Sequence, residues 1–258
     1  MPVSKQSSER SKAKTTGLAA LSVAQKRELL RLLEEKERRR RRNNIITFFP
    51  DEGPLRRDLY TKHIEFFAAG ADYRERLFLA ANRVGKSVAG SYEMALHLTG
   101  RYPEWWRGRR FEHPVSAWAA GDTNETVRDI IQLELLGDIS EPGTGMIPGD
   151  DIVDTTRRPG VPDAIQTILV KHVTGGTSRL GLKSYDQKRK AFQGTAKHII
   201  WLDEEPPQDV YAECLLRTMT TDGIILLTFT PLLGISDVVK SFLHDGRVPQ
   251  DSAAEAVH

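Results

Sequence analysis

The sequence predicts an α/β fold in which helices cover both faces of a parallel central sheet. Beyond Pro50, short apolar runs of strand length alternate with longer segments of helical periodicity. Strands that alternate with helices imply a parallel sheet, because each connecting helix packs back onto the sheet. Polar motifs directly follow two of the apolar runs, at the sheet edge where α/β folds place their sites.

Each expected strand is a short apolar run, and several expected helices begin at a recognisable signal. Asp122 or Thr123 is a suitable cap for a helix that runs to Leu136, and Pro207 suits the first position of another helix. The stretch EPGTGMIPGDD is typical of a loop. The expected strands span residues 77–81, 115–120, 165–173, 180–182, 198–202 and 224–229, and the expected helices span 86–98, 123–136 and 210–219.

The overall composition is that of a globular protein, with 39% hydrophobic and 28% charged residues. No apolar run approaches the roughly 18 residues needed to cross a bilayer, and the N-terminus lacks the apolar region of a signal peptide. We therefore expect a cytoplasmic protein without membrane contact. The single cysteine, Cys214, excludes an internal disulfide and is expected to be a small core residue.

Residues 1–44 carry the basic charge of the chain, with 13 Lys and Arg against five Glu. Residues 1–20 are polar, so we expect them to be disordered. A helix of about 20 residues should begin near Ser22, which has the spacing of a capping box with Gln25. The helix ends in the run Arg38 to Arg42, which either contacts a nucleic-acid backbone or is a solvated helix end.

The stretch FLAANRVGKS matches the phosphate-binding pattern G-x-x-x-x-G-K-[ST], except that Ala80 holds the position of the first glycine. In such loops the backbone N–H groups surround phosphate oxygens, the lysine reaches the β and γ phosphates, and the hydroxyl holds Mg²⁺. Alanine at position 80 still permits the turn if its φ stays negative. The residues expected to bind ATP are Ala80, Asn82, Arg83, Val84, Gly85, Lys86 and Ser87.

A second motif, HIIWLDEEPP, places acidic residues at the end of a buried strand. We expect Asp203 to hold Mg²⁺ through water and Glu204 to polarise the water that attacks the γ-phosphate. Alternatively, the acids only cap the helix that follows. Asp203 lies 117 positions after Lys86, which leaves room for intervening units, as in ATPases that insert a strand between the two motifs and use a catalytic glutamate.

Thr228 and Thr230 form a polar pair at the end of the next core strand. We expect them to lie beside the γ-phosphate and to pass its loss to another subdomain. Alternatively, their hydroxyls only cap backbone groups in a turn.

Five segments together resemble the ATPase domain of the large terminase subunit of tailed bacteriophages, over residues 55–245. They are ERLFLAANRVGKS, EMALHLTGRYPEWW, KSYDQKRKAFQG, WLDEEPP and LLTFTPLLG, in this order. The resemblance implies a RecA-like P-loop fold of the additional-strand, catalytic-glutamate type, with Mg²⁺ and ATP as cofactors. It also implies double-stranded DNA as the moved substrate. The implied partners are a small terminase subunit, the portal of a procapsid and further copies of the chain in a ring.

Position by position, the resemblance assigns Lys86 to the phosphates, Ser87 and Asp203 to the metal, and Glu204 to catalysis. It assigns Thr228 and Thr230 to coupling. Arg83 either stabilises charge at the γ-phosphate, as a further catalytic residue, or forms an ion pair below the loop. A neighbouring subunit of such rings can supply an arginine, and the sequence does not select among the candidates Arg107, Arg109, Arg110, Arg157 and Arg158.

Two features depart from the family pattern. His63 stands upstream of the loop, where such motors often have a glutamine that reads adenine, so the sequence leaves adenine recognition open. The last acids, Asp245, Asp251 and Glu255, lie in a polar tail, so we expect no nuclease domain and no nuclease activity.

The predicted organisation is a basic segment at 1–44, an ATPase domain at 45–248 and a short tail at 249–258. A DNA-dependent ATPase of the helicase or recombinase kind and a non-hydrolysing remnant are the alternative functions.

Overall fold

The computed structural model describes residues 21–81, 83–231 and 235–243 of the chain. The chain divides into two compact units, with the division between Arg41 and Arg42. The disorder predicted for residues 1–20 and the tail predicted for 249–258 lie outside the described residues.

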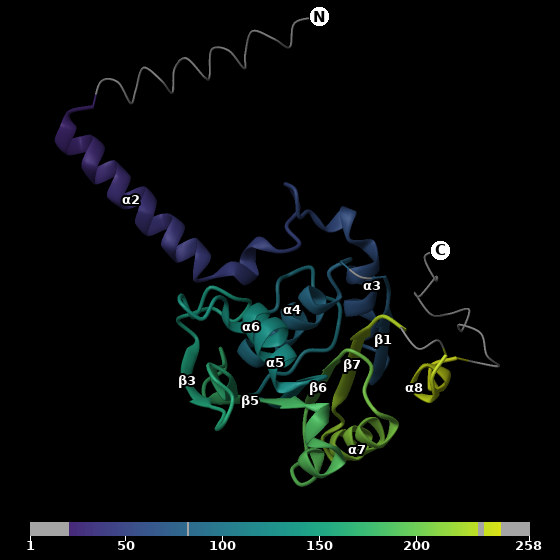
Figure 1. The fold of residues 1–258 in the computed structure, drawn as a ribbon. Coiled ribbons are helices and arrows are strands. Elements are labelled where there is room, and N and C mark those ends of the chain that lie inside the picture. The colour runs from purple at the N-terminus through teal and green to yellow at the C-terminus, as the bar shows by residue number, and fades with distance from the viewer. Residues whose placement is uncertain (1–20, 82, 232–234, 244–258) are drawn as a thin grey trace, which may run out of the picture. The chain divides into compact units, whose positions relative to one another are not determined.

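The first unit contains the predicted basic helix, α2, which spans Val23–Arg41 (Figure 1). Its start has the predicted capping box, in which Ser22 and Gln25 exchange two hydrogen bonds of 2.9 and 3.2 Å between backbone and side chain. Arg38 to Arg41 occupy the last turn, where positive charge suits the helix dipole.

The second unit is built on a seven-stranded sheet with the order β1-β7-β6-β2-β5-β4-β3 (Figure 1). The strands are β1 (Glu75–Leu79), β2 (Ser116–Gly121), β3 (Ile152–Arg157), β4 (Ile165–Lys171), β5 (Thr177–Ser184), β6 (Ile199–Asp203) and β7 (Ile224–Phe229).

The five strands from β1 to β5 in this order run parallel, as predicted. Strand β4 runs antiparallel to β5, and β3 runs antiparallel to β4. The turn between β4 and β5 is too short for the crossover that a parallel connection needs, so it produces a hairpin. Strand β7 lies between β1 and β6. A strand is thus inserted between the two that carry the predicted phosphate and acidic motifs.

Helices cover both faces of the sheet in the described part of the second unit. Their bounds are α3 (Thr61–Ala69), α4 (Lys86–Thr99), α5 (Asn124–Thr126), α6 (Leu133–Leu136), α7 (Gln208–Thr218) and α8 (Asp237–Ser241). A π-helical segment, η3 (Val127–Gln132), joins α5 to α6. The short 3₁₀ turns are η1 (Asn44–Thr47), η2 (Arg57–Leu59), η4 (Tyr185–Gln187), η5 (Arg189–Phe192) and η6 (Met219–Thr221).

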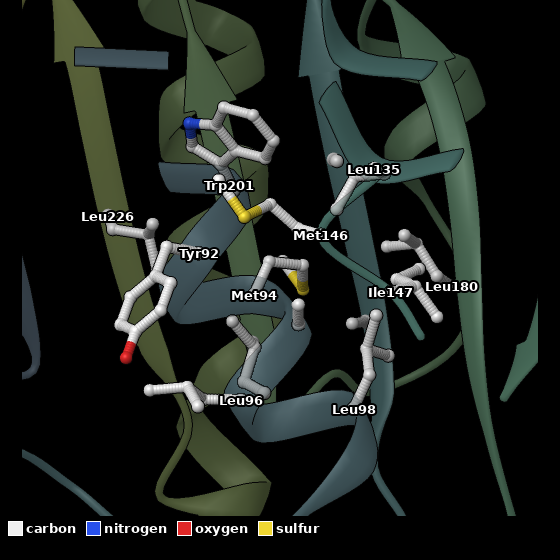
Figure 2. Packing of buried hydrophobic residues seen from close by; sticks show 14 of the residues in the cluster. Tyr92, Met94, Leu96, Leu98, Leu135, Met146, Ile147, Leu180, Trp201 and Leu226 are labelled. Carbon is white, nitrogen blue, oxygen red and sulfur yellow. The ribbon is translucent and has the colours of Figure 1, made fainter. Parts of the chain in front are cut away.

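Strand β6 supplies side chains to two separate hydrophobic cores, because successive residues of a strand point to opposite faces. Ile199 and Trp201 pack with α3, α4 and the α5–α6 region, whereas Ile200 and Leu202 pack with α7 and α8. Figure 2 shows α4 within the first core, together with Trp201 of β6. Burial along nearly all of α4 gives the residues at its start a rigid support.

Several sequence predictions need adjustment at their boundaries. Pro207 is the N-cap of α7, with an extended ψ of 143°, and the helix begins one residue later. Thr123 is the cap of the helix at 124–136, which includes the unpredicted π segment.

Cys214 is buried, as predicted. No helix among the described residues is long and apolar enough to cross a membrane.

Candidate functional site

The loop between β1 and α4 has the backbone features of a tight turn around a small ligand. Gly85 adopts φ +84° and is the N-cap of α4, and Arg83 adopts φ +65°. Ala80 keeps a negative φ, so the alanine at this position causes no backbone strain. Asn82, the remaining predicted member of the loop, lies outside the described residues.

Lys86 lies at the first position of α4 and connects the loop to the end of β7. Its Nζ donates hydrogen bonds of 2.8 Å to the carbonyl of Ala81 and to Thr230 Oγ1. Thr230 Oγ1 in turn donates to the carbonyl of Ala80, over 2.9 Å. Burial lowers the pKa of Lys86, and the nearby charges of Glu204 and Asp203 oppose that shift.

Ser87 and Asp203 meet at the carboxyl edge of the sheet. The Ser87 hydroxyl lies 3.1 Å from both carboxylate oxygens of Asp203, which ends β6 and is 3% exposed. Thr228 Oγ1 donates a third hydrogen bond to the same carboxylate, at 2.6 Å from Oδ1. Burial raises the pKa of Asp203 to about 6, against the opposing effect of the Thr228 and Ser87 hydrogen bonds.

Glu204 follows directly and presents an exposed side chain at this edge. Its φ of +64° is a left-handed conformation that costs a residue other than glycine on the order of 1–3 kcal/mol. Two contacts hold its backbone: its N–H donates to the Thr228 carbonyl over 3.1 Å, and its carbonyl lies 3.1 Å from the Tyr185 hydroxyl. Strain held in this way is typical of functional positions.

The acidic cluster does not cap the helix that follows it. Pro207 is the N-cap of α7, and no side chain makes a capping hydrogen bond there. The structure therefore argues against the alternative in which Asp203 and Glu204 serve only as a helix cap.

Thr228 of β7 and Thr230, which follows the strand, contact the two motifs separately. Thr228 donates to Asp203 and accepts a 2.7 Å hydrogen bond from the indole of Trp201, whereas Thr230 contacts Lys86. Thr230 also bonds the backbone of Ala80, as the simpler capping interpretation expects, but Thr228 bonds side chains.

A pocket of about 410 Å³ lies beside the loop. It is lined by Phe48, Phe49, Leu55, Tyr60, His63, Arg83, Val84, Gly85 and Val88. His63 is buried, which lowers its pKa, and its Nε2 would lie 3.3 Å from a Cβ added at Gly85. An aromatic pocket with a few polar groups suits a flat heterocycle.

The arginines predicted to act at the site make few contacts with its other residues. Arg83 is exposed and lines this pocket, and it forms no ion pair with another described residue, which argues against the ion pair below the loop. None of the five candidates for a subunit-bridging arginine is hydrogen-bonded to a site residue in the described segments. Arg109, for example, pairs with Asp222 at 2.8 Å, and Arg158 donates to the Leu182 carbonyl.

Two contributors were not predicted from the sequence, namely Trp201 and Tyr185. Trp201 stands two positions before Asp203 on one strand, so the period of the strand was a signal that both share a face. Tyr185 follows β5, and its hydroxyl reaches the carbonyls of Asp203 and Glu204 across the sheet edge. No local sequence pattern predicts that Tyr185 contacts these carbonyls.

A Gly-Lys-Ser loop before α4, acids at the end of β6 and the inserted β7 define a P-loop nucleoside-triphosphatase fold of the RecA-like, additional-strand class.

The comparisons give the family within this class. The family model described as "Terminase large subunit, T4likevirus-type, N-terminal" matches residues 77–256, and the chain belongs to this family. The terminase large subunit of Salmonella phage P22 is 43% identical over 243 residues, which cover 86% of this chain and 47% of that protein. The terminase large subunit of Enterobacteria phage LP7 is 27% identical over 245 residues, with 86% and 48% covered. The chain thus spans about half the length of these curated relatives.

A solved structure shows the same fold. The large terminase ATPase domain of Thermus phage P74-26 aligns with a TM-score of 0.51 and 17% identity, covering 74% of this chain and 73% of that one. The predicted resemblance to the terminase ATPase domain is confirmed.

Proposed function

We propose that this chain is the ATPase part of a DNA-packaging motor, which hydrolyses ATP with Mg²⁺ and uses the energy to drive double-stranded DNA into a procapsid. The observation that carries this proposal is the contact of Ser87 with Asp203, which joins the phosphate motif to the acidic motif. Membership of the terminase large-subunit family supports the choice of DNA packaging over other uses of this fold.

The residues around Asp203 fit a magnesium ion. A hydroxyl and a carboxylate supply the hard oxygen ligands that Mg²⁺ prefers, and substrate phosphates and waters supply the rest. Burial is the main cause of the raised pKa of Asp203, and the ammonium of Lys86 offsets it only in part, so a bound cation would stabilise this carboxylate further. When bound, Mg²⁺ would neutralise charge on the β and γ phosphates.

Lys86, Arg83 and Glu204 would act on the triphosphate itself. To reach phosphate, Lys86 must exchange its hydrogen bonds to Ala81, which lies in the loop, and to Thr230, which follows β7. Arg83 would stabilise negative charge at the γ-phosphate, and Glu204 would orient and polarise the attacking water. The exposed side chain of Glu204 at the sheet edge supports this assignment.

The pocket beside the loop is our proposed site for the adenine ring. Phe49 and Tyr60 offer ring surfaces, and buried His63 offers a neutral imidazole in place of the glutamine of related motors. We propose that the aromatic walls bind the base and that His63 provides the polar contact.

Thr228 and Thr230 are suited to couple hydrolysis to movement. Because one contacts Asp203 and the other contacts Lys86, any rearrangement of either motif on loss of the γ-phosphate reaches the end of β7. The segment after β7 would transmit this rearrangement to another subdomain.

The remaining parts of the assembly follow from the family. We propose a small terminase subunit, a procapsid portal and further copies of the chain in a ring as partners, acting in the cytoplasm of a bacterial host. Residues 45–248 would form the ATPase domain, preceded by the basic segment 1–44 and followed by a tail at 249–258. The expected lack of nuclease activity stays a prediction.

Mg²⁺-dependent ATP hydrolysis and binding of a fluorescent ATP analogue by the purified chain test the proposal. Lys86→Ala should abolish Mg-nucleotide binding, and Glu204→Gln should bind nucleotide but not hydrolyse it. Glu205→Gln and Lys171→Ala, which change the same residue types outside the proposed machinery, serve as matched controls. The site assignment fails if Lys86→Ala and Glu204→Gln match these controls in both assays. Because a neighbouring subunit can complete the site, binding is the more decisive readout.

A further inference from the structure

We propose that Trp201 is a positioning residue for the Asp203 carboxylate and acts through the hydroxyl of Thr228. The inference rests on the proposed function, because it takes Asp203 as the residue that holds the metal. It assigns a role to an indole that is fully buried in the hydrophobic core.

The three side chains form a continuous hydrogen-bond chain. Trp201 Nε1 lies 2.7 Å from Thr228 Oγ1, and Thr228 Oγ1 lies 2.6 Å from Asp203 Oδ1. The backbone pairing produces this geometry, because Asp203 is the register partner of Thr228 in the parallel pair β6–β7. Trp201 is two residues before Asp203 and therefore projects from the same face of β6.

The chemistry of the indole fixes the direction of both hydrogen bonds. An indole N–H can only donate, so Thr228 Oγ1 must accept from Trp201. The single hydroxyl proton of Thr228 is then free to point at Asp203, which accepts it as a carboxylate. Without the indole, Thr228 has a second rotamer choice, since threonine hydroxyls readily bond nearby backbone groups.

The indole itself cannot move away. Trp201 is fully buried in the first core, among the side chains around α4 shown in Figure 2. A Cβ added to Gly90 of α4 would lie only 2.3 Å from Trp201 Cε2, so the ring packs directly on the helix backbone. Packing against α4, which begins at the phosphate loop, thus fixes the position of the Trp201 ring, and the ring orients the Thr228 hydroxyl through its hydrogen bond.

The consequence is a carboxylate with a set orientation. Thr228 binds Oδ1 at 2.6 Å, whereas Ser87, at 3.1 Å, is the only partner of Oδ2 in the described chain. A partner that orients a metal-binding carboxylate in this way changes the affinity for the metal when it is removed, by about 10- to 100-fold.

The Mg²⁺ dependence of nucleotide binding tests the role of Trp201. Trp201→Phe keeps an aromatic ring and removes the N–H. The Mg²⁺ concentration that gives half-maximal binding of a fluorescent ATP analogue should rise about 10- to 100-fold, while binding in EDTA stays within about twofold of the parent. Thr228→Val should show the same shift, and the double variant should add little to it, because both remove one chain of bonds. Trp118→Phe, in the other core, is the matched control.

The proposal is overturned if the Mg²⁺ concentration for half-maximal binding is the same for Trp201→Phe as for Trp118→Phe, while it is raised for Thr228→Val. A second measurement covers the case in which Trp201→Phe does not fold. In nitrogen-15 spectra, Thr228→Val should shift the indole N–H signal of Trp201 and speed its hydrogen exchange, and leave the other tryptophans unchanged. An unaltered Trp201 signal would also overturn the proposal. If the parent bound no Mg-nucleotide, the proposed function would fail, and the indole signal would still decide whether the chain of bonds exists.

Discussion

The Ser87 hydroxyl lies 3.1 Å from each carboxylate oxygen of Asp203, although 116 positions separate the two residues in the sequence. The strands that lead to them, β1 and β6, are not neighbours, because β7 lies between them. Thr228 of that inserted strand contacts the same carboxylate. Three segments far apart in the chain therefore meet at one point of the sheet edge.

Asp203→Asn should raise the free energy of unfolding above pH 6. Burial gives Asp203 a folded-state pKa of about 6, above its unfolded value of 3.8, so the parent loses stability as pH rises through this range. A pKa shift of this size lowers the free energy of unfolding of the parent by about 3 kcal/mol at neutral pH. Urea unfolding without Mg²⁺ should show the variant to be more stable at pH 7.5 and equal to the parent near pH 4. A variant that is less stable at pH 7.5 would contradict the assigned burial cost.

Tyr185→Phe should slow ATP hydrolysis about tenfold or more and leave nucleotide affinity unchanged. The hydroxyl lies 3.0 Å from the Asp203 carbonyl and 3.1 Å from the Glu204 carbonyl, and it supports the strained backbone of Glu204. Loss of such a buried hydrogen bond costs about 1–3 kcal/mol. Single-turnover hydrolysis and equilibrium binding separate the two effects, with exposed Tyr73→Phe as the control. An unchanged hydrolysis rate would show that Tyr185 does not position Glu204.

Gly90→Ala should lower the melting temperature, although alanine ordinarily stabilises a helix relative to glycine. The added Cβ would lie 2.3 Å from the rigid indole of Trp201, which the core prevents from moving. Overpacking of this kind costs about 1–3 kcal/mol. Thermal unfolding followed by circular dichroism measures the change. A higher melting temperature would mean that the indole has room to shift.

Arg76→Met should destabilise the chain by about 3–5 kcal/mol, because it removes the guanidinium that pairs with a buried carboxylate. Arg76 Nη2 lies 2.6 Å from Glu93 Oε1, and the two side chains are 4% and 0% exposed. The double variant Arg76→Met, Glu93→Leu should recover much of that loss, since it removes both charges. Denaturant unfolding of the two variants gives the comparison. A single variant as stable as the parent would show that Glu93 does not depend on Arg76.

The residues of contiguous motifs were predictable, and those brought in by strand pairing were not. Lys86, Ser87, Asp203 and Glu204 stand in short motifs with a known spacing. The sequence alone therefore placed the first two at the start of a helix and the last two at the end of a strand. Trp201 reaches Thr228 only because β6 pairs with β7, which no local pattern specifies.

The fold shows the same limit. Alternating apolar runs predicted the parallel strands, whereas β3, with the sequence IVDTTR, is mostly exposed and offers no apolar run to recognise. The antiparallel edge of the sheet depends on the pairing of β3 with β4, which only the structure shows.

The decisive measurement is a structure of the chain with Mg²⁺ and a nonhydrolysable ATP analogue. We expect the γ-phosphate between Lys86 and the Asp203–Glu204 pair, the metal next to Ser87, and the adenine in the pocket beside His63. A nucleotide bound elsewhere, or one whose phosphates contact the loop while Asp203 and Glu204 remain remote, would contradict it.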